Sequence, residues 1–241
     1  MKRRIHLPAL KAGRVELTQE QSHYLRDVLR LKSGAEVELF DNAGAVARGV
    51  LVDAESRRMI VDVDRPHSQE RQPWRWTIAS AVPKANRADW MIEKISELGA
   101  SAYIPLNAGR SVVVPEGHNK MQRWQRLASE ASRQSRRRGV MAIEPLASPE
   151  QVLCKHQGRQ IWYLSTEPAA LPIRQAMERL DFGRGLVLLI GAEGGWTEQE
   201  IEMFTEHSLT GVRLTETILR VETAAVAAAA IMACWAAEQV S

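Results

Sequence analysis

LVLLIGAEGG, at residues 186–195, decides the fold, because an apolar strand runs there straight into a loop with almost no side chains. Thr197 stands three residues before Glu200, which is the spacing of a capping box, so a helix is expected directly after the loop. The loop matches neither Gly-x-Gly-x-x-Gly nor the Gly-Lys-Ser/Thr ending of a P-loop, so neither common nucleotide fingerprint applies. Strand, glycine loop and helix in this order predict a small-molecule site, with a plain tight turn as the alternative.

From Trp74 onward, apolar strand-like runs alternate with longer segments of helical periodicity. This alternation is typical of a mostly parallel sheet that helices cover on both faces. Strands are predicted near residues 76–82, 101–106, 160–164, 186–190 and 211–215, with a weaker one near 142–146. Helices are predicted near residues 87–98, 120–138, 171–181, 198–207 and 222–238. We therefore expect residues 73–241 to form one α/β domain.

Residues 1–72 show another pattern, in which short strand-like runs follow one another closely and one helix interrupts them. Thr18 and Gln21 have the spacing of a capping box and predict the start of that helix, which ends before Gly34. The strands are expected at Val37–Phe40, Val50–Val52 and Ile60–Val63. This order predicts a small β-barrel domain, joined to the rest by the polar segment 65–73.

Composition limits the class of protein without identifying it. The 241 residues are enough to bury a core, and a formal net charge of +3 favours an anionic partner. Cys154 and Cys234 lie far apart and the histidines do not cluster, so neither a disulfide framework nor a metal site is expected. The apolar segment Ala224–Ala237 is short for a bilayer span, and the first ten residues lack a signal-peptide core. The sequence predicts a cytoplasmic protein without a membrane segment.

Loops after the carboxyl ends of parallel strands are the usual ligand sites of such sheets. Three of them are expected here, at Leu164–Glu167, Gly191–Gly195 and Leu214–Ala224. In the third, Arg220 and Glu222 directly precede a very apolar helix. The pair is either part of a site or an Arg–Glu pair that caps the helix, and spacing alone leaves both interpretations open.

The segment from Lys120 to Arg138 is strongly basic. Glu130 is its single acidic residue among six arginines, which are Arg123, Arg126, Arg133, Arg136, Arg137 and Arg138. A basic helix face of this kind suits the phosphates of RNA or DNA, with a solvated surface helix as the alternative. His23 is expected to be structural.

Five segments of the chain match a known family in the same order. HYLRDVLRLKSGAEVELFDNAG at residues 23–44 and KANRADWMIEKISELGASAYIPLNAGRSVV at residues 84–113 are the first two. RWQRLASEASRQSRRR at 123–138, IGAEGGWTEQE at 190–200 and LRVETAAVAA at 219–228 follow. With these segments the chain resembles the RsmE-type 16S ribosomal RNA uridine N3-methyltransferases of the SPOUT superfamily. Ala192 stands where that family usually has proline, which removes a φ restraint but no functional group.

The resemblance implies a fold and its partners. Residues 1–72 would form a PUA-like β-barrel that binds RNA, and residues 73–241 a SPOUT domain whose C-terminal part is a trefoil knot that binds S-adenosylmethionine. The substrate would be 16S ribosomal RNA of the small ribosomal subunit, and the protein would be a homodimer. The cofactor would contact Leu164, Ser165, Thr166, Glu167, Ile190, Gly191, Glu193, Gly194, Gly195, Leu214, Leu219, Thr223 and Ala224.

Methylation of uracil N3 sets the roles expected of the site residues. The ring nitrogen attacks as its proton leaves and negative charge develops on O2 and O4, and Arg220 is expected to stabilise that charge. Glu222 or Glu193 would orient Arg220 or accept the proton. RNA contacts are expected from Arg26, Arg30, Lys84, Arg110, Arg133, Arg136, Arg137 and Arg138. Two alternatives stay open, a SPOUT enzyme acting on a ribose 2′-hydroxyl or on transfer RNA, and a non-catalytic RNA-binding assembly protein.

Overall fold

The computed structural model describes residues 3–54, 57–68, 75–84, 86–113, 118–137 and 139–238. The chain divides into two compact units, Met1–Gln72 with Ser132–Val140, and Pro73–Ala131 with Met141–Ser241. The units differ from the predicted pair of contiguous domains because Ser132–Val140 packs with the first one. Arg138 and residues 69–74, which include most of the predicted linker, lie outside the described residues.

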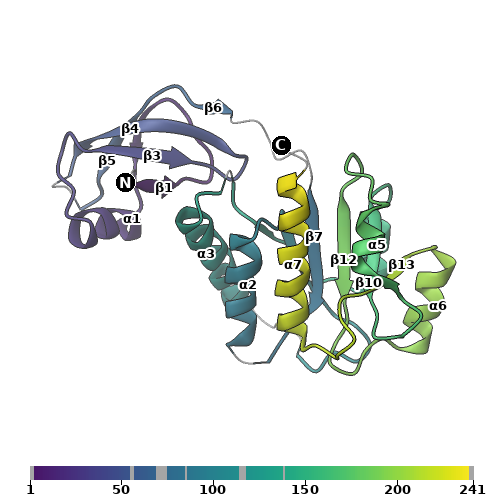
Figure 1. The fold of residues 1–241 in the computed structure, drawn as a ribbon. Helices are drawn as coiled ribbons and strands as arrows, with labels where there is room; N and C mark the ends of the chain where they lie inside the picture. Colours follow the sequence, from purple (N-terminus) through teal and green to yellow (C-terminus); the bar gives the residue numbers. More distant parts are fainter. Residues whose placement is uncertain are drawn as a thin grey trace. The chain divides into compact units, whose positions relative to one another are not determined.

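A six-stranded sheet forms the first unit, with the order β1-β3-β4-β5-β2 and with β6 paired to β4 (Figure 1). Its strands are β1 (Arg4–His6), β2 (Gly13–Glu16), β3 (Glu36–Phe40), β4 (Ala45–Asp53), β5 (Ile60–Val63) and β6 (His67–Ser68). β1 pairs with β3 in parallel, and the other pairs are antiparallel. Asp41 makes the turn between β3 and β4, because its Oδ1 accepts hydrogen bonds from the backbone amides of Ala43 and Ala45.

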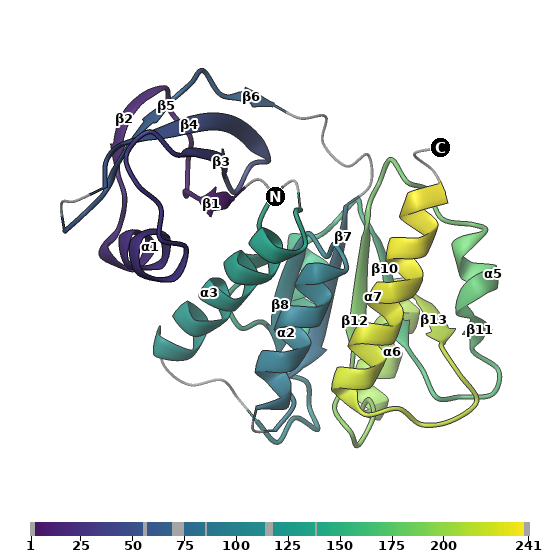
Figure 2. The same cartoon turned by 60° about the vertical axis from the view of Figure 1, so that its left-hand side comes forward.

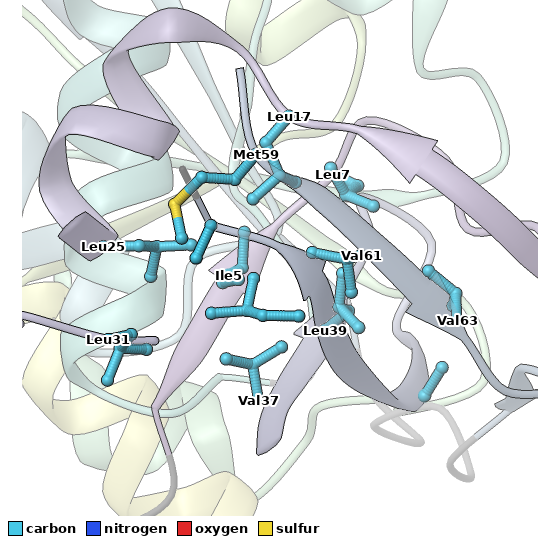
Figure 3. Packing of buried hydrophobic residues seen from close by; sticks show 13 residues of the cluster. Ile5, Leu7, Leu17, Leu25, Leu31, Val37, Leu39, Met59, Val61 and Val63 are labelled. Carbon is cyan, nitrogen blue, oxygen red and sulfur yellow. The ribbon is translucent and has the colours of Figure 1, made fainter. Parts of the chain in front are cut away.

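One helical segment closes the core of the first unit. α1 (Gln19–His23) begins at the predicted capping box of Thr18 and Gln21, and the π-helix η1 (Tyr24–Val28) continues it. Figure 3 shows Leu25 of η1 beside Met59 and the buried side chains of the strands, such as Leu39. The predicted small β domain is confirmed, and its core consists of aliphatic side chains and one methionine.

The second unit contains a seven-stranded sheet with the order β11-β13-β10-β12-β7-β8-β9. Its strands are β7 (Trp76–Ala81), β8 (Ala102–Leu106), β9 (Ala142–Ile143), β10 (Gln160–Leu164), β11 (Leu171–Pro172), β12 (Leu186–Ile190) and β13 (Thr210–Arg213). All neighbouring strands are parallel. The predicted α/β class is therefore confirmed, although β11 was not foreseen.

Helices cover both faces of this sheet. They are α2 (Arg87–Glu97), α3 (His118–Gln134), α4 (Pro149–Lys155), α5 (Ile173–Met177), α6 (Glu198–Glu206) and α7 (Val221–Glu238). α7 lies beside α2 and packs against β7 and β12 (Figure 2). On the opposite face, Phe204 of α6 and Val152 of α4 join the strand residues Val187 and Leu189 in one apolar cluster. α4 was not predicted, although Ser148 and Gln151 form its capping box.

α3 and α5 differ from the predicted helices in length, since α5 spans only Ile173–Met177 where a helix at 171–181 is predicted. α3 ends at Gln134, and Arg136 has a φ of 57°, so the predicted helix at 120–138 is too long at its C-terminal end. α7 spans 18 residues and by length and composition is able to cross a membrane, contrary to the expectation from its apolar segment. Ala225, Ala228 and Met232 of α7 are fully buried within the unit. We therefore interpret α7 as a core helix.

β13 is inserted between two strands that lie close together in the sequence. Val212 pairs with Leu164 of β10 on one side and with Leu171 of β11 on the other. Residues 165–170, which join β10 to β11, therefore have to pass β13. This arrangement is the part of the fold in which the knot is expected, and the knot itself stays a prediction.

Candidate active site

Five neighbouring strands of the second unit end at the same edge of the sheet. Because β13, β10, β12, β7 and β8 are parallel and adjacent, the loops that follow them lie along this carboxyl edge. The three predicted loops follow β10, β12 and β13, which are direct neighbours. Lys84 and Arg110 lie in the loops after β7 and β8. The sheet order thus brings segments from five places in the sequence to one edge.

The glycine loop after β12 is a tight turn. The backbone amide of Gly195 donates a 2.8 Å hydrogen bond to the carbonyl of Ala192, and Gly195 has a φ of 75°, which favours glycine. A side chain at Gly191 would meet the Trp196 ring at 3.0 Å. Trp196 in turn donates from Nε1 to the carbonyl of Leu164 at 2.8 Å, so its indole joins the glycine loop to the loop after β10.

The loop after β8 holds the glycine loop from the other side. Arg110 Nη1 donates a 2.6 Å hydrogen bond to the carbonyl of Gly194. Glu200, a buried residue of α6, accepts at 2.9 Å from the backbone amide of Gly109 and at 2.8 Å from that of Thr197. Arg110, predicted as an RNA contact, therefore supports the glycine loop in this structure.

The loops after β10 and β13 expose polar groups. Thr166 and Glu167 are exposed, and the amide of Glu167 is held at 3.1 Å by the hydroxyl of Ser165. Ile218 is 80% exposed, while Leu214 and Leu219 are half-buried and Thr223 is exposed. Ile190 and Ala224 are buried.

Arg87, a residue that the sequence did not single out, contacts two of the predicted site carboxylates. Its Nη1 lies 3.1 Å from Glu222 Oε1 and 3.9 Å from Glu193 Oε1. Glu222 is buried, and its Oε2 has no hydrogen-bond partner among the residues that the structure describes. Arg87 begins the helix after β7, the strand next to β12, so applying the strand-end argument to β7 would have found it.

Arg220 stands apart from this group. Its side chain is exposed, and its backbone carbonyl accepts a 2.8 Å hydrogen bond from the amide of Ala224 at the start of α7. Within the described ranges no ion pair joins it to Glu222, which contacts Arg87 instead. Among the described residues the Arg220–Glu222 capping pair is therefore not formed, and a role of Glu222 in orienting the guanidinium of Arg220 stays a prediction.

Two of the predicted RNA contacts have structural partners in the first unit. Arg133 donates from Nη1 to the Tyr24 hydroxyl at 2.8 Å, and its guanidinium lies 4.5 Å from the centre of the Tyr24 ring. Burial lowers the pKa of Arg137 to about 10, and the carbonyl of Arg137 accepts a hydrogen bond from Arg4. These contacts fix the C-terminal end of α3 and the residues that follow it to the strands and helix of the first unit.

The remaining predicted RNA contacts are more accessible. Arg30, Arg136 and Lys84 are exposed, and Arg26 is half-buried and paired with Asp27. Arg138 lies outside the described residues.

Known proteins match both units. The chain matches an RNA methyltransferase domain over residues 70–233 and an RNA methyltransferase PUA domain over residues 17–64. It is 30% identical over 223 residues to ribosomal RNA small subunit methyltransferase E of Bacillus subtilis, a match that covers 89% of this chain and 87% of that protein. It is 34% identical to the protein of the same name from Synechocystis sp., covering 87% and 69% of the two chains.

A solved structure agrees with these matches. The crystal structure of a ribosomal RNA small subunit methyltransferase E from Neisseria gonorrhoeae bound to S-adenosyl methionine is 28% identical, with a TM-score of 0.83. The superposition covers 96% of this chain and 97% of that one. The chain therefore belongs to the RNA methyltransferase family that includes the ribosomal RNA small subunit methyltransferase E proteins.

Proposed function

We propose that the protein transfers the methyl group of S-adenosylmethionine to N3 of a uridine in 16S ribosomal RNA. The observation that carries this proposal is the meeting of three loops with an exposed arginine and carboxylates at one edge of the parallel sheet. Membership of the RNA methyltransferase family supports it, as do the names of the relatives from Bacillus subtilis and Synechocystis.

The residues at this edge fit S-adenosylmethionine. The exposed backbone of Gly194 and Gly195 allows close approach of adenine and ribose edges, as do the polar groups of residues 165–167. The exposed carboxylate of Glu193 suits the positive charge of a sulfonium better than a nest of amides would. The residues assigned to the cofactor are those predicted from the sequence, with Ile190 and Ala224 acting through their backbones.

The chain supplies charge stabilisation and a proton acceptor. Bound S-adenosylmethionine offers a methyl group on a positively charged sulfur; as the S–CH3 bond breaks and the N3–CH3 bond forms, the sulfur becomes a neutral thioether. The N3 proton of uracil passes to a carboxylate of the site, for which Glu193 and Glu222 are the candidates. The exposed guanidinium of Arg220 stabilises the negative charge on O2 and O4 with its fixed fork of donors.

RNA phosphates are assigned to the accessible basic residues. Arg26, Arg30 and Arg136 lie in the first unit, and Lys84 lies at the carboxyl edge of the second. Replacing Arg30 and Arg136 by glutamate should weaken binding to 16S ribosomal RNA without changing the melting temperature, and the loss should shrink as salt rises. Arg133→Glu is the contrast, because it removes the hydrogen bond to Tyr24 and should destabilise the fold.

We also propose that the protein is a homodimer and that it is located in the cytoplasm. Ile231 and Trp235 of α7 are half-buried, and Trp235 Nε1 has no hydrogen-bond partner within the described part of the chain, which favours a second surface against this helix. Met232 is fully buried within the unit and is excluded from that surface. Light scattering of the purified protein tests the dimer, and a Trp235→Glu variant should be monomeric.

Methyl transfer to isolated small ribosomal subunits, followed by nucleoside analysis, tests the proposal. N3-methyluridine is the expected product. A 2′-O-methylated nucleoside, or methylation of transfer RNA alone, would instead identify one of the other SPOUT activities. A protein that binds RNA but neither binds S-adenosylmethionine in calorimetry nor transfers its methyl group would be a non-catalytic assembly protein.

A further inference from the structure

We infer that Arg87 is a positioning residue of the active site, which fixes the buried Glu222 and leaves Glu193 as the carboxylate that accepts the proton. This inference rests on the proposed methyl transfer and goes beyond it, because that proposal leaves the two carboxylates equivalent. It follows from the contacts of one guanidinium nitrogen and from the unequal burial of its two partners.

The arginine joins three segments of the second unit. Arg87 lies at the first turn of α2, Glu193 in the glycine loop, and Glu222 at the first turn of α7. Arg87 Nη1 donates to Glu222 Oε1 at 3.1 Å, within hydrogen-bond range, and lies 3.9 Å from Glu193 Oε1, beyond it. The contact with Glu222 is therefore the firm one, and Glu193 is held only by charge.

Burial separates the two carboxylates further. The side chain of Glu222 is 8% exposed, whereas those of Glu193 and Arg87 are 59% and 37% exposed. A buried carboxylate is costly without a cation, so Glu222 and Arg87 require each other. Neither oxygen of Glu222 is open to a substrate, since Oε1 contacts Arg87 and Oε2 has no access to solvent. The exposed Glu193 is the carboxylate that a uracil N3–H can reach.

The hydrogen-bonded pair of Arg87 and Glu222 also fixes the start of α7, which directly follows Arg220. Arg220 precedes Glu222 by two residues, and its carbonyl accepts the first helical hydrogen bond from Ala224. With Glu222 locked to α2, the backbone that carries Arg220 is held in place relative to the glycine loop. Arg87 thus positions both the group that stabilises charge and the group that accepts the proton, without touching the reacting atoms.

Four substitutions at three residues test the inference. Arg87→Gln should lower the single-turnover rate on small ribosomal subunits on the order of 100-fold, with a small change in the affinity for S-adenosylhomocysteine. Arg87→Lys keeps the cation and should recover part of that rate. Glu193→Gln should lose more of the rate than Glu222→Gln.

Controls separate this inference from the proposed function and from misfolding. Arg174→Gln, at an arginine of α5 that is 88% exposed, should behave as wild type. An active wild type with an unaffected Arg87→Gln, or a Glu222→Gln that is inactive while Glu193→Gln transfers methyl groups, refutes the inference alone. A wild type that methylates no RNA refutes the proposed function. Should Arg87→Gln fail to fold, Arg87→Lys decides by itself: a reduced single-turnover rate with an unchanged affinity for S-adenosylhomocysteine supports the inference, and wild-type behaviour overturns it.

Discussion

The two edges of the parallel sheet use arginine in opposite ways. At the amino edge, Arg159 donates to Thr77 Oγ1, to the carbonyl of Arg75 and to that of Leu186, at 3.0 to 3.1 Å. These three acceptors lie at the starts of β7 and β12, beside β10, so the guanidinium fastens the neighbouring strands together. At the carboxyl edge, Arg220 is exposed and contacts no carboxylate among the described residues. The arginine at the amino edge is therefore used in contacts within the protein, whereas the one at the carboxyl edge is free to meet the ligand that we propose.

The glycines at the two edges differ in how much room the structure leaves for a side chain. Gly185, directly before β12, has a φ of 67°, and a Cβ there would lie 2.8 Å from the backbone carbonyl of Arg75. Gly194, after the same strand, would place a Cβ 3.3 Å from the flexible side chain of Arg110 and faces solvent otherwise. The fold requires glycine at position 185, whereas at the exposed position 194 a side chain would meet only the flexible Arg110.

Arg220→Ala should have the largest effect and should act on the rate alone. We expect a loss of roughly 2–4 kcal/mol of transition-state stabilisation, because the guanidinium acts on charge that develops during transfer. Single-turnover methylation of small ribosomal subunits measures this loss. A collapse of cofactor binding or of the melting temperature would show that Arg220 belongs to the scaffold, as Arg159 does.

Gly185→Ala should act on stability alone. The left-handed backbone and the approach to the Arg75 carbonyl together should cost about 2–3 kcal/mol in the free energy of unfolding. Gly194→Ala is the matched variant across the same strand and should keep the wild-type stability while weakening the binding of S-adenosylmethionine. Urea unfolding and calorimetry on both proteins check the pair, and equal stability losses would contradict the contrast between the edges.

Arg159→Ala should destabilise the second unit by about 1–2 kcal/mol, since removing this half-buried donor leaves three acceptors without that partner. Its folded fraction should retain the wild-type affinity for S-adenosylmethionine. The exposed Arg174→Ala serves as the control for stability. If Arg159→Ala changed cofactor affinity at full stability, the amino edge would take part in the site.

His156, which precedes Arg159 at the amino edge, should produce the smallest effect. Burial, followed by the neighbouring Arg159, lowers the pKa of His156 below its usual 6.5. The unfolded chain therefore takes up a proton first as the pH falls below 6.5, so stability is complete above that pH and declines below it. Melting temperatures at pH 7.5 and 5.5 should differ less in His156→Gln than in wild type. Burial also lowers the pKa of His6, in the first unit, which affects wild type and variant alike.

The sequence predicts the carboxyl edge better than it predicts the partners of individual side chains. The capping box of Thr197 and Glu200 and the apolar run at 186–190 depend on local spacing, so the glycine loop and its helix were predictable. Arg87 meets Glu222 across 135 positions of sequence, a contact that only the sheet order creates. The end of α3 at Gln134 was missed because an arginine-rich segment has no local stop signal before Gly139.

Hydrogen–deuterium exchange with and without S-adenosylhomocysteine tests most directly whether the carboxyl edge is the cofactor site. Protection should rise in the peptides that cover residues 164–167, 190–195 and 214–224, because their backbones are assigned to the ligand. Peptides at the amino edge, around Arg159 and Gly185, should exchange at unchanged rates. Protection confined to the amino edge or to the first unit, or no protection at saturating ligand, would contradict the assignment.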